Sequence, residues 1–134
     1  SLFFDNIRNW DNNPNDLWVH LLDSVTPGAE KHYDGQGGGD YFAGQGVLLH
    51  HWQNLSTNPQ DILYNFDPTE IAALTSYVAD GNFGFGFDPD CHYWNDGITL
   101  TITTGDPVPE PSTILLVGLG LVGLIGLGGK RFKK

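Results

Sequence analysis

The chain has 134 residues, of which 16 are Asp or Glu and only six are Lys or Arg, so its formal net charge at pH 7 is −10. Four of the six basic residues lie in the last five positions, which leaves Arg8 and Lys31 against fifteen acidic residues in positions 1–106, a net charge of −13. Phosphate contacts require a positive surface, so this composition excludes nucleic-acid binding as the function of that region.

The beginning of the chain does not read as an export leader. Its first five residues, Ser-Leu-Phe-Phe-Asp, contain neither a basic segment nor a long apolar core. We therefore expect the chain to be a mature form or a fragment of a longer protein. Positions 1–106 suffice for one small acidic domain with a single core, and Cys91, the single cysteine, permits no disulfide within the chain.

Strands dominate the first half of this region. Residues 17–22, 47–52 and 62–66 are apolar runs rich in β-forming residues and bounded by turn residues, so each is a predicted strand. Between the first two, residues 26–46 contain seven glycines and few apolar side chains. This composition predicts a long surface loop that can carry a binding site.

One helix is predicted over residues 68–79. Asp67 suits the N-cap, Pro68 suits the first helical position, and Glu70 completes a capping box. Three apolar residues then recur on one helical face: Ile71, Leu74 and Val78. Gly81 is placed to end the helix.

Two alternating segments predict the last strands. Phe and Gly alternate over residues 83–87, and Ile or Leu alternates with Thr over residues 98–102, so each segment has one apolar face. We expect the two strands to pair as an antiparallel hairpin across the connector 88–97. The predicted fold class is mainly β, an antiparallel β-sandwich of jelly-roll type with one covering helix.

The connector also holds the candidate metal ligands. Asp88, Asp90 and Asp96, with Asn95 beside them, could gather oxygens around Ca²⁺, a hard cation that suits an acidic exported protein. The pattern lacks the full EF-hand series and its closing Glu, and turn formation or capping is the alternative role of these residues. Calcium is therefore the one candidate cofactor, and none is required.

Two other groups could carry chemistry. His50, His51 and His92 could form a transition-metal site, but adjacent residues of a strand point to opposite faces, so at most one of the first two could join His92. Aromatic residues are numerous: Trp10, Trp18, Trp52 and Trp94 with Tyr33, Tyr41 and Tyr93. They either fill the core of a small sandwich or form platforms on which sugar rings stack.

The last 28 residues form a tail of three parts. Residues 107–112 are a proline-rich linker, residues 113–129 are an uncharged apolar run, and residues 130–134 are basic. The apolar run predicts a short C-terminal transmembrane helix, since the sixteen residues 114–129 span roughly 24 Å. Basic residues then hold the end of the chain in the cytoplasm as a membrane stop: Lys130, Arg131, Lys133 and Lys134.

The sequence Val-Pro-Glu-Pro-Ser at 108–112, followed by the glycine-rich span and the basic end, resembles the PEP-CTERM sorting signal. The resemblance implies that Pro109, Glu110 and Pro111 are recognised by an exosortase, a membrane-embedded transpeptidase that cuts near them. It also implies an exported protein of a Gram-negative bacterium, anchored in the inner membrane as a precursor and then delivered to the envelope or the extracellular matrix. The alternative is an ordinary single-span membrane protein.

Enzymatic motifs are absent from the sequence, which has no Gly-x-Ser-x-Gly elbow, zinc-protease helix or phosphate-binding loop. We therefore expect a non-enzymatic envelope or matrix protein associated with exopolysaccharide. The alternative is a calcium-dependent or carbohydrate-binding adhesion module. A binding module needs exposed aromatic residues in the loop 26–46 or the connector 88–97, whereas a structural protein buries them.

Overall fold

The computed structural model describes residues 1–11, 15–31, 39–89 and 93–105, and Ser1–Ile102 form one compact unit. The elements of this unit follow in chain order: β1 (Leu2–Asn9), β2 (Asp16–Leu22), β3 (Val47–Gln53), β4 (Gln60–Tyr64), α1 (Pro68–Tyr77), the 3₁₀ turn η1 (Val78–Asp80), β5 (Gly84–Pro89), β6 (Tyr93–Trp94) and β7 (Gly97–Leu100). Residues from Thr103 onward belong to a second unit.

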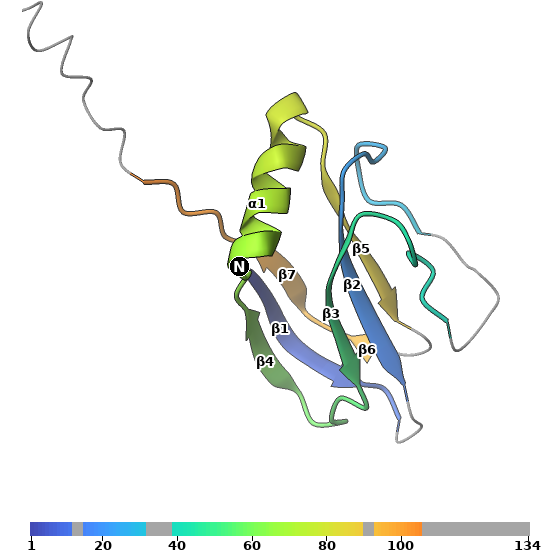
Figure 1. The fold of residues 1–134 in the computed structure, drawn as a ribbon. Coiled ribbons are helices and arrows are strands. Elements are labelled where there is room, and N and C mark those ends of the chain that lie inside the picture. The colour runs from blue at the N-terminus through green and yellow to red at the C-terminus, as the bar shows by residue number, and fades with distance from the viewer. Residues whose placement is uncertain (12–14, 32–38, 90–92, 106–134) are drawn as a thin grey trace, which may run out of the picture. The chain divides into compact units, whose positions relative to one another are not determined.

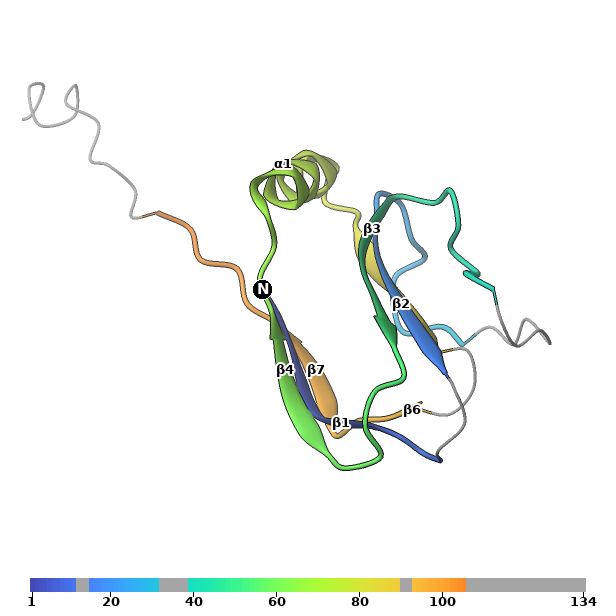
Figure 2. The same cartoon turned by 60° about the horizontal axis from the view of Figure 1, so that its bottom comes forward.

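The strands form two antiparallel sheets, whose central strands are β1 and β2 (Figure 1). β1 pairs with β4 on one side and with β6 and β7 on the other. β2 pairs with β3 and β5. Figure 2 shows the sheets as two layers, with β1, β4 and β7 in one and β2 and β3 in the other. The predicted mainly β fold with one helix is thus confirmed.

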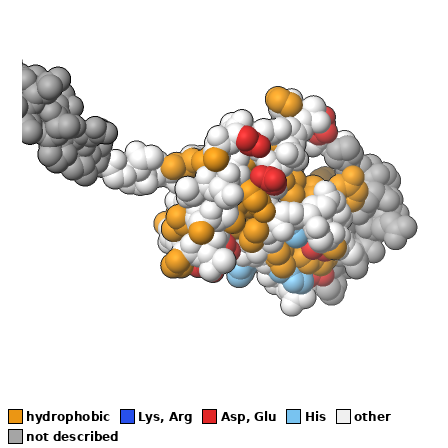
Figure 3. Space-filling view, turned by 45° about the horizontal axis from the view of Figure 1, so that its top comes forward, with side chains coloured by type: hydrophobic (Ala, Val, Ile, Leu, Met, Phe, Trp, Pro, Cys, Tyr) orange, Lys and Arg blue, Asp and Glu red, His pale blue; other side chains and the backbone are white. Residues whose placement is uncertain are grey.

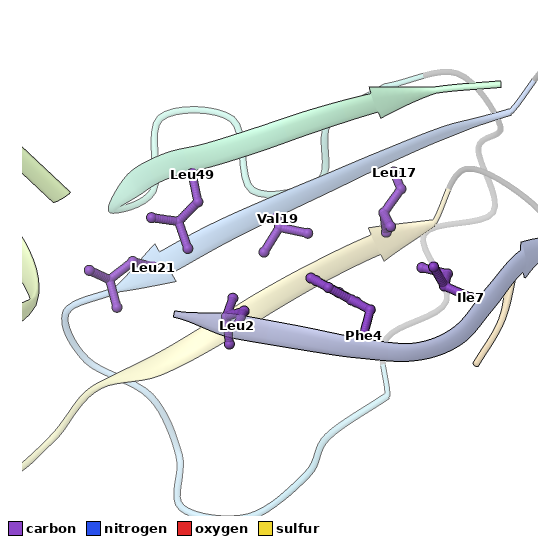
Figure 4. Packing of buried hydrophobic residues seen from close by; sticks show 7 residues of the cluster. All are labelled: Leu2, Phe4, Ile7, Leu17, Val19, Leu21 and Leu49. Atoms are coloured by element: carbon purple, nitrogen blue, oxygen red, sulfur yellow. The ribbon is translucent and has the colours of Figure 1, made fainter. Parts of the chain in front are cut away.

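The core lies between the two central strands. Its buried residues come from β1, β2 and β3: Leu2, Phe4, Ile7, Leu17, Val19, Leu21 and Leu49. Figure 4 shows the side chains of β1 pointing toward those of β2. Full burial of such side chains contributes about 1.5–3 kcal/mol each, so the facing pair of strands is the main source of stability.

A β-bulge interrupts β1. Its register against β4 shifts between Phe4 and Ile7, where two residues of β1 face Asp61 alone. Asn6 in the bulge has a φ of 50°, a left-handed conformation that Asn tolerates better than most residues. The extra residue reverses the alternation of side chains, so burial moves from even positions (Leu2, Phe4) to odd ones.

The predicted hairpin between residues 83–87 and 98–102 is wrong. β5 pairs with β2 and β7 pairs with β1, so the two strands lie in different sheets. Pairing with the central strands β2 and β1 lets the apolar residues of both strands pack against the core from two sheets. The jelly-roll topology is not found either, because the described residues form seven strands in sheets of four and three rather than two four-stranded sheets.

The helix begins as predicted. Asp67 Oδ1 accepts hydrogen bonds from the amides of Thr69 (2.7 Å) and Glu70 (2.8 Å), and Glu70 Oε2 accepts one from the Asp67 amide (2.7 Å), which completes the capping box. Regular α-helix ends at Tyr77, two residues earlier than predicted, and Gly81 ends the following turn with a φ of 81°.

The predicted apolar face of the helix is wrong in part. Ile71 is 51% exposed and Val78 is 37% exposed, and only Leu74 of the predicted three packs against the core. Ala73 and Tyr77 also pack there. Compared with the prediction, the helix is turned about its axis, so that a different face packs on the core. Its buried charged residue, Glu70, is held toward β4 by the hydrogen bond with the Tyr64 hydroxyl.

Tyr64 connects the helix to both sheets. Its hydroxyl lies 2.6 Å from the Leu49 carbonyl oxygen and 2.5 Å from Glu70 Oε1, so β4, β3 and α1 meet at one phenol. Burial is the first cause that raises the pKa of Tyr64 above its ordinary range, and the hydrogen bond and negative charge of Glu70 raise it further. The phenol therefore stays protonated in the folded chain.

The glycines of β5 leave room for side chains from the loop after β2. A Cβ on Gly86 would lie 2.7 Å from the ring of Phe42, and one on Gly84 would lie 2.8 Å from Val25. The loop that carries Phe42 is held by buried His20, whose Nδ1 lies 3.1 Å from the Gln45 carbonyl and whose Nε2 lies 3.0 Å from Asp40 Oδ2.

We predict that stability falls as the pH rises above about 10, the ordinary pKa of tyrosine. Below that pH the phenol of Tyr64 is protonated in both states, whereas above it the unfolded chain releases the proton and the folded chain keeps it. Tyr64→Phe should reduce this pH dependence and cost about 1 kcal/mol at pH 7. Denaturant unfolding of the chain in detergent, followed by tryptophan fluorescence, measures both effects.

Tyr77→Phe is the control, because the Tyr77 hydroxyl makes no hydrogen bond to the described residues. It should leave the alkaline loss of stability unchanged. An identical alkaline loss in wild type and Tyr64→Phe would refute the link between helix and sheets.

Candidate functional site

The four tryptophans differ in their surroundings: Trp52 packs against the core, Trp18 stacks on His51 outside it, and the other two are exposed. Trp52 packs against Phe4, with ring centroids 5.3 Å apart, and Trp18 stacks on His51 at 4.5 Å. Trp10 and Trp94, in contrast, are 67% and 50% exposed. The exposed pair marks a candidate site, and the predicted role of such rings as sugar-stacking platforms stays a prediction.

The bulge in β1 places the residues of this site. Without the extra residue at Asn6, the even positions would continue to point into the core, and Arg8 would follow Phe4 there. With it, Ile7 and Asn9 are buried and Arg8 points the other way. Trp94 lies directly opposite Arg8 in the pairing of β1 with β6, so their side chains share one face.

These residues line a pocket. It has a volume of about 290 Å³ and is lined by Arg8, Trp10 and Trp94. The guanidinium carbon of Arg8 lies 6.0 Å from the ring centroid of Trp94, within the range of a cation–π contact. The pocket therefore combines two indole rings with one cation.

A polar network holds the rim on the Trp94 side. Asn6 Nδ2 donates to Asp96 Oδ2 (3.0 Å) and to Asp5 Oδ1 (3.1 Å), and the Asp96 amide donates to the Asp5 carbonyl (2.9 Å). Asp96 Oδ1 in turn accepts a hydrogen bond of 3.4 Å from the indole nitrogen of Trp94. The residue that forms the bulge is thus bonded to the turn that positions Trp94.

A second network fixes the strands beneath the pocket. Buried Asn15 donates to Asn9 Oδ1 (2.6 Å), and the Asn15 carbonyl accepts hydrogen bonds from the Tyr93 hydroxyl (2.9 Å) and the Asn54 amide (2.8 Å). Asn9 and Tyr93 are the neighbours of Arg8 and Trp94 and are paired with each other across the strands. Asn9 and Tyr93 are held by these hydrogen bonds, so the strand segments that carry Arg8 and Trp94 are fixed in place.

The chemistry of the pocket is suited to binding. Indole rings offer flat apolar surfaces with little rotamer entropy to lose, and they pack on the C–H face of a sugar ring. The guanidinium offers up to five N–H donors to hydroxyl or carboxylate oxygens. Of the described residues that line the pocket, Arg8, Trp10 and Trp94, none is a nucleophile or a general acid or base at neutral pH.

The predicted calcium ligands are only partly described. Asp88 Oδ2 accepts a hydrogen bond from the Tyr41 amide (2.7 Å), and Asp96 accepts the bonds from Asn6 and Trp94. Asp90 lies outside the described residues. Within the described ranges, no group of three His, Cys, Asp or Glu residues could hold a metal ion, and the calcium site stays a prediction.

The two histidines of β3, His50 and His51, have different neighbours. His51 Nε2 lies 2.8 Å from Asp16 Oδ1, and its ring stacks on Trp18. His50 lies near the rings of Trp52 (4.3 Å) and Tyr64 (5.4 Å). His92 lies outside the described residues, so its relation to them stays a prediction.

The charge of the described surface is uneven. Figure 3 shows acidic and histidine side chains among apolar ones, and no Lys or Arg is visible on the described part of that face. Arg8 is one of only two basic residues in positions 1–106. Sequence reasoning counted Arg8 only toward the net charge. Its spacing of two residues from Trp10, which follows the end of β1, was the available signal that the two lie on one side of the chain.

Comparison with known protein families identifies the tail. Residues 107–131 match the family model of the PEP-CTERM protein-sorting motif, so the chain carries this sorting signal, the mark of an exosortase substrate. The signal implies export and processing of a membrane-associated precursor by an exosortase. No curated protein and no solved structure matches the chain.

The predicted sorting residues Pro109, Glu110 and Pro111, and the predicted membrane stop at 130–134, lie outside the described residues. So does the predicted transmembrane helix at 113–129. No helix among the described residues is long and apolar enough to span a membrane.

Proposed function

We propose that the chain is a non-enzymatic protein of the cell envelope or extracellular matrix whose β-domain binds saccharide through Arg8, Trp10 and Trp94. The observation that carries the proposal is the exposure of two tryptophans on either side of one arginine in a single pocket. The sequence alone favoured a structural matrix protein and gave a carbohydrate-binding module as the alternative. The proposal now prefers the carbohydrate-binding alternative.

The exposure of aromatic residues in the two long connections supports this choice. Trp94, in the connector 88–97, is 50% exposed, and Tyr41, in the glycine-rich loop, is 41% exposed. A purely structural domain gains stability by burying such rings, because each can remove 150–250 Å² from water. Rings that stay at the surface despite this gain are consistent with a role in binding a ligand.

The size of the pocket supports a small ligand unit. Its volume of about 290 Å³ lies at the lower end of the range for ligand pockets, which is about 300–1,000 Å³. An open pocket of this size accommodates one unit of a polymer while the rest of the polymer stays in solvent. The proposed partner is therefore a polysaccharide held one unit at a time, which suits an exported protein that meets extracellular polymer.

The binding proposal predicts that Trp94→Ala weakens saccharide binding at least about tenfold, which corresponds to 1.4 kcal/mol, the loss typical of an aromatic hot-spot residue. Isothermal titration of the chain in detergent against a panel of neutral and acidic oligosaccharides measures the effect. Leu63→Ala removes another apolar side chain, 60% exposed and away from the pocket, and should leave affinity unchanged. Equal losses in both variants, or no binding by wild type, would refute the proposal.

The sorting proposal predicts that Glu110→Ala leaves an uncleaved, membrane-bound precursor in the native host, because the charged centre of the Pro-Glu-Pro element is lost. Fractionation and mass measurement of the released protein check this. Glu30→Ala, the same substitution in the exported region, should be processed normally. Release of Glu110→Ala in normal amount and with normal mass would show that Glu110 is not part of the recognised signal.

A further inference from the structure

We propose that the saccharide unit bound in the pocket carries a carboxylate, as a uronic acid does, and that Arg8 binds this group between Trp10 and Trp94. The inference rests on the proposed function, because it names the class of sugar that the same pocket binds. It adds a selectivity that neither the sorting signal nor the exposed tryptophans require.

The first argument is the state of Arg8. The side chain is half-buried, and among the described residues no carboxylate lies within 4.0 Å of its guanidinium. The guanidinium has a cation–π contact with the ring of Trp94, which helps to orient it. The ring does not accept hydrogen bonds from the N–H groups along the edge of the guanidinium. A half-buried guanidinium thus lines the pocket, and no carboxylate among the described residues accepts its hydrogen bonds.

The second argument is the composition around it. Fifteen acidic residues share positions 1–106 with Arg8 and Lys31, so carboxylate partners were abundant in the chain. Asp96, two residues after Trp94, is instead bonded to Asn6 and Trp94. The Asp96 carboxylate thus binds the indole N–H of Trp94 and not the Arg8 guanidinium, which has no carboxylate partner among the described residues.

The third argument is the match of geometry. A planar guanidinium binds a planar carboxylate through two parallel N–H···O bonds, which a neutral hydroxymethyl group cannot reproduce. A pyranose ring stacked on either indole would place a carboxylate attached to that ring near the edge of the pocket where Arg8 lies. The three lining residues therefore fit a ring that is apolar on one face and anionic at one edge.

Electrostatics also limits how the ligand is held. A net charge of −13 in positions 1–106 repels an anionic polymer at a distance, so no broad positive surface can attract it. Selectivity for a carboxylate must then arise from the short-range contact with Arg8. A sulfate ester could also bind a guanidinium through two of its oxygens, so sulfated chains serve as a separate arm of the test.

The experiment compares one oligosaccharide in two forms. Oligogalacturonate and the same oligosaccharide after reduction of its carboxylates to hydroxymethyl groups differ in nothing else. Both are titrated calorimetrically into the full chain in detergent, with EDTA present so that no divalent cation bridges protein and ligand. We expect the acidic form to bind at least about tenfold more tightly.

Arg8→Gln should abolish this difference, because it weakens binding of the acidic form far more than binding of the reduced form, whereas Arg8→Lys should retain only part of the difference, because charge without the fork remains. Lys31→Gln removes the same charge from the other basic residue of the region and should change neither affinity. Thermal unfolding of each variant, followed by tryptophan fluorescence, verifies that the fold is intact. If Arg8→Gln does not fold, the Arg8→Lys variant and the two ligand forms still decide the question.

The possible failures are distinguishable. Equal binding of both forms by wild type would overturn the carboxylate inference and leave saccharide binding standing. Tighter binding of a sulfated oligosaccharide of equal length, or a requirement for calcium in place of EDTA, would also overturn it. Binding of neither form, nor of any sugar in the panel, would overturn the proposed function itself.

Discussion

The β-bulge at Asp5 and Asn6 is the constraint on which the rest of the domain depends. β1 must bury Leu2 and Phe4 against β2 in its first half and expose Arg8 in its second half, and a regular strand cannot do both with residues of the same parity. One extra residue resolves this conflict. Its cost is one non-glycine residue with a positive φ, of order 1 kcal/mol, which the hydrogen bonds of Asn6 offset.

The same bulge joins three parts of the first sheet. The Asn6 amide donates to Asp61 of β4 (3.1 Å), and its side chain donates to Asp96 in the turn between β6 and β7. The two partners are 55 and 90 residues away in sequence, so they reach Asn6 only when both edges of the sheet are in place. Formation of the core and placement of Trp94 are therefore parts of one structural event.

Local features of the fold were predictable, and non-local ones were not. The cap at Asp67, the box with Glu70 and the ending at Gly81 depend on neighbours within a few residues, so the sequence shows them directly. The rotation of the helix depends on the Tyr64 hydroxyl from another element, and the partners of β5 and β7 depend on strands far along the chain. Short-range alternation specifies which face of a strand is apolar but not what covers that face.

The candidate site shows the same division. The sequence identified Trp10 and Trp94 as members of an aromatic set but gave no means to separate them from Trp18 and Trp52, because exposure is decided by the bulge and by cross-strand pairing. Arg8 was visible only as a charge. The sorting signal, in contrast, is a linear sequence motif, so it was recognised from sequence, and the family match at residues 107–131 confirms it.

The most direct test of the central claim is a titration of the four indole N–H signals by ¹H–¹⁵N NMR, with oligogalacturonate added to the ¹⁵N-labelled chain in detergent. The account predicts that the signals of Trp10 and Trp94, which line the pocket, shift together with one saturation curve, whereas those of Trp18 and Trp52 stay in place. Saturable shifts at Trp18 or Trp52, with Trp10 and Trp94 unmoved, would place the binding surface elsewhere and contradict the account.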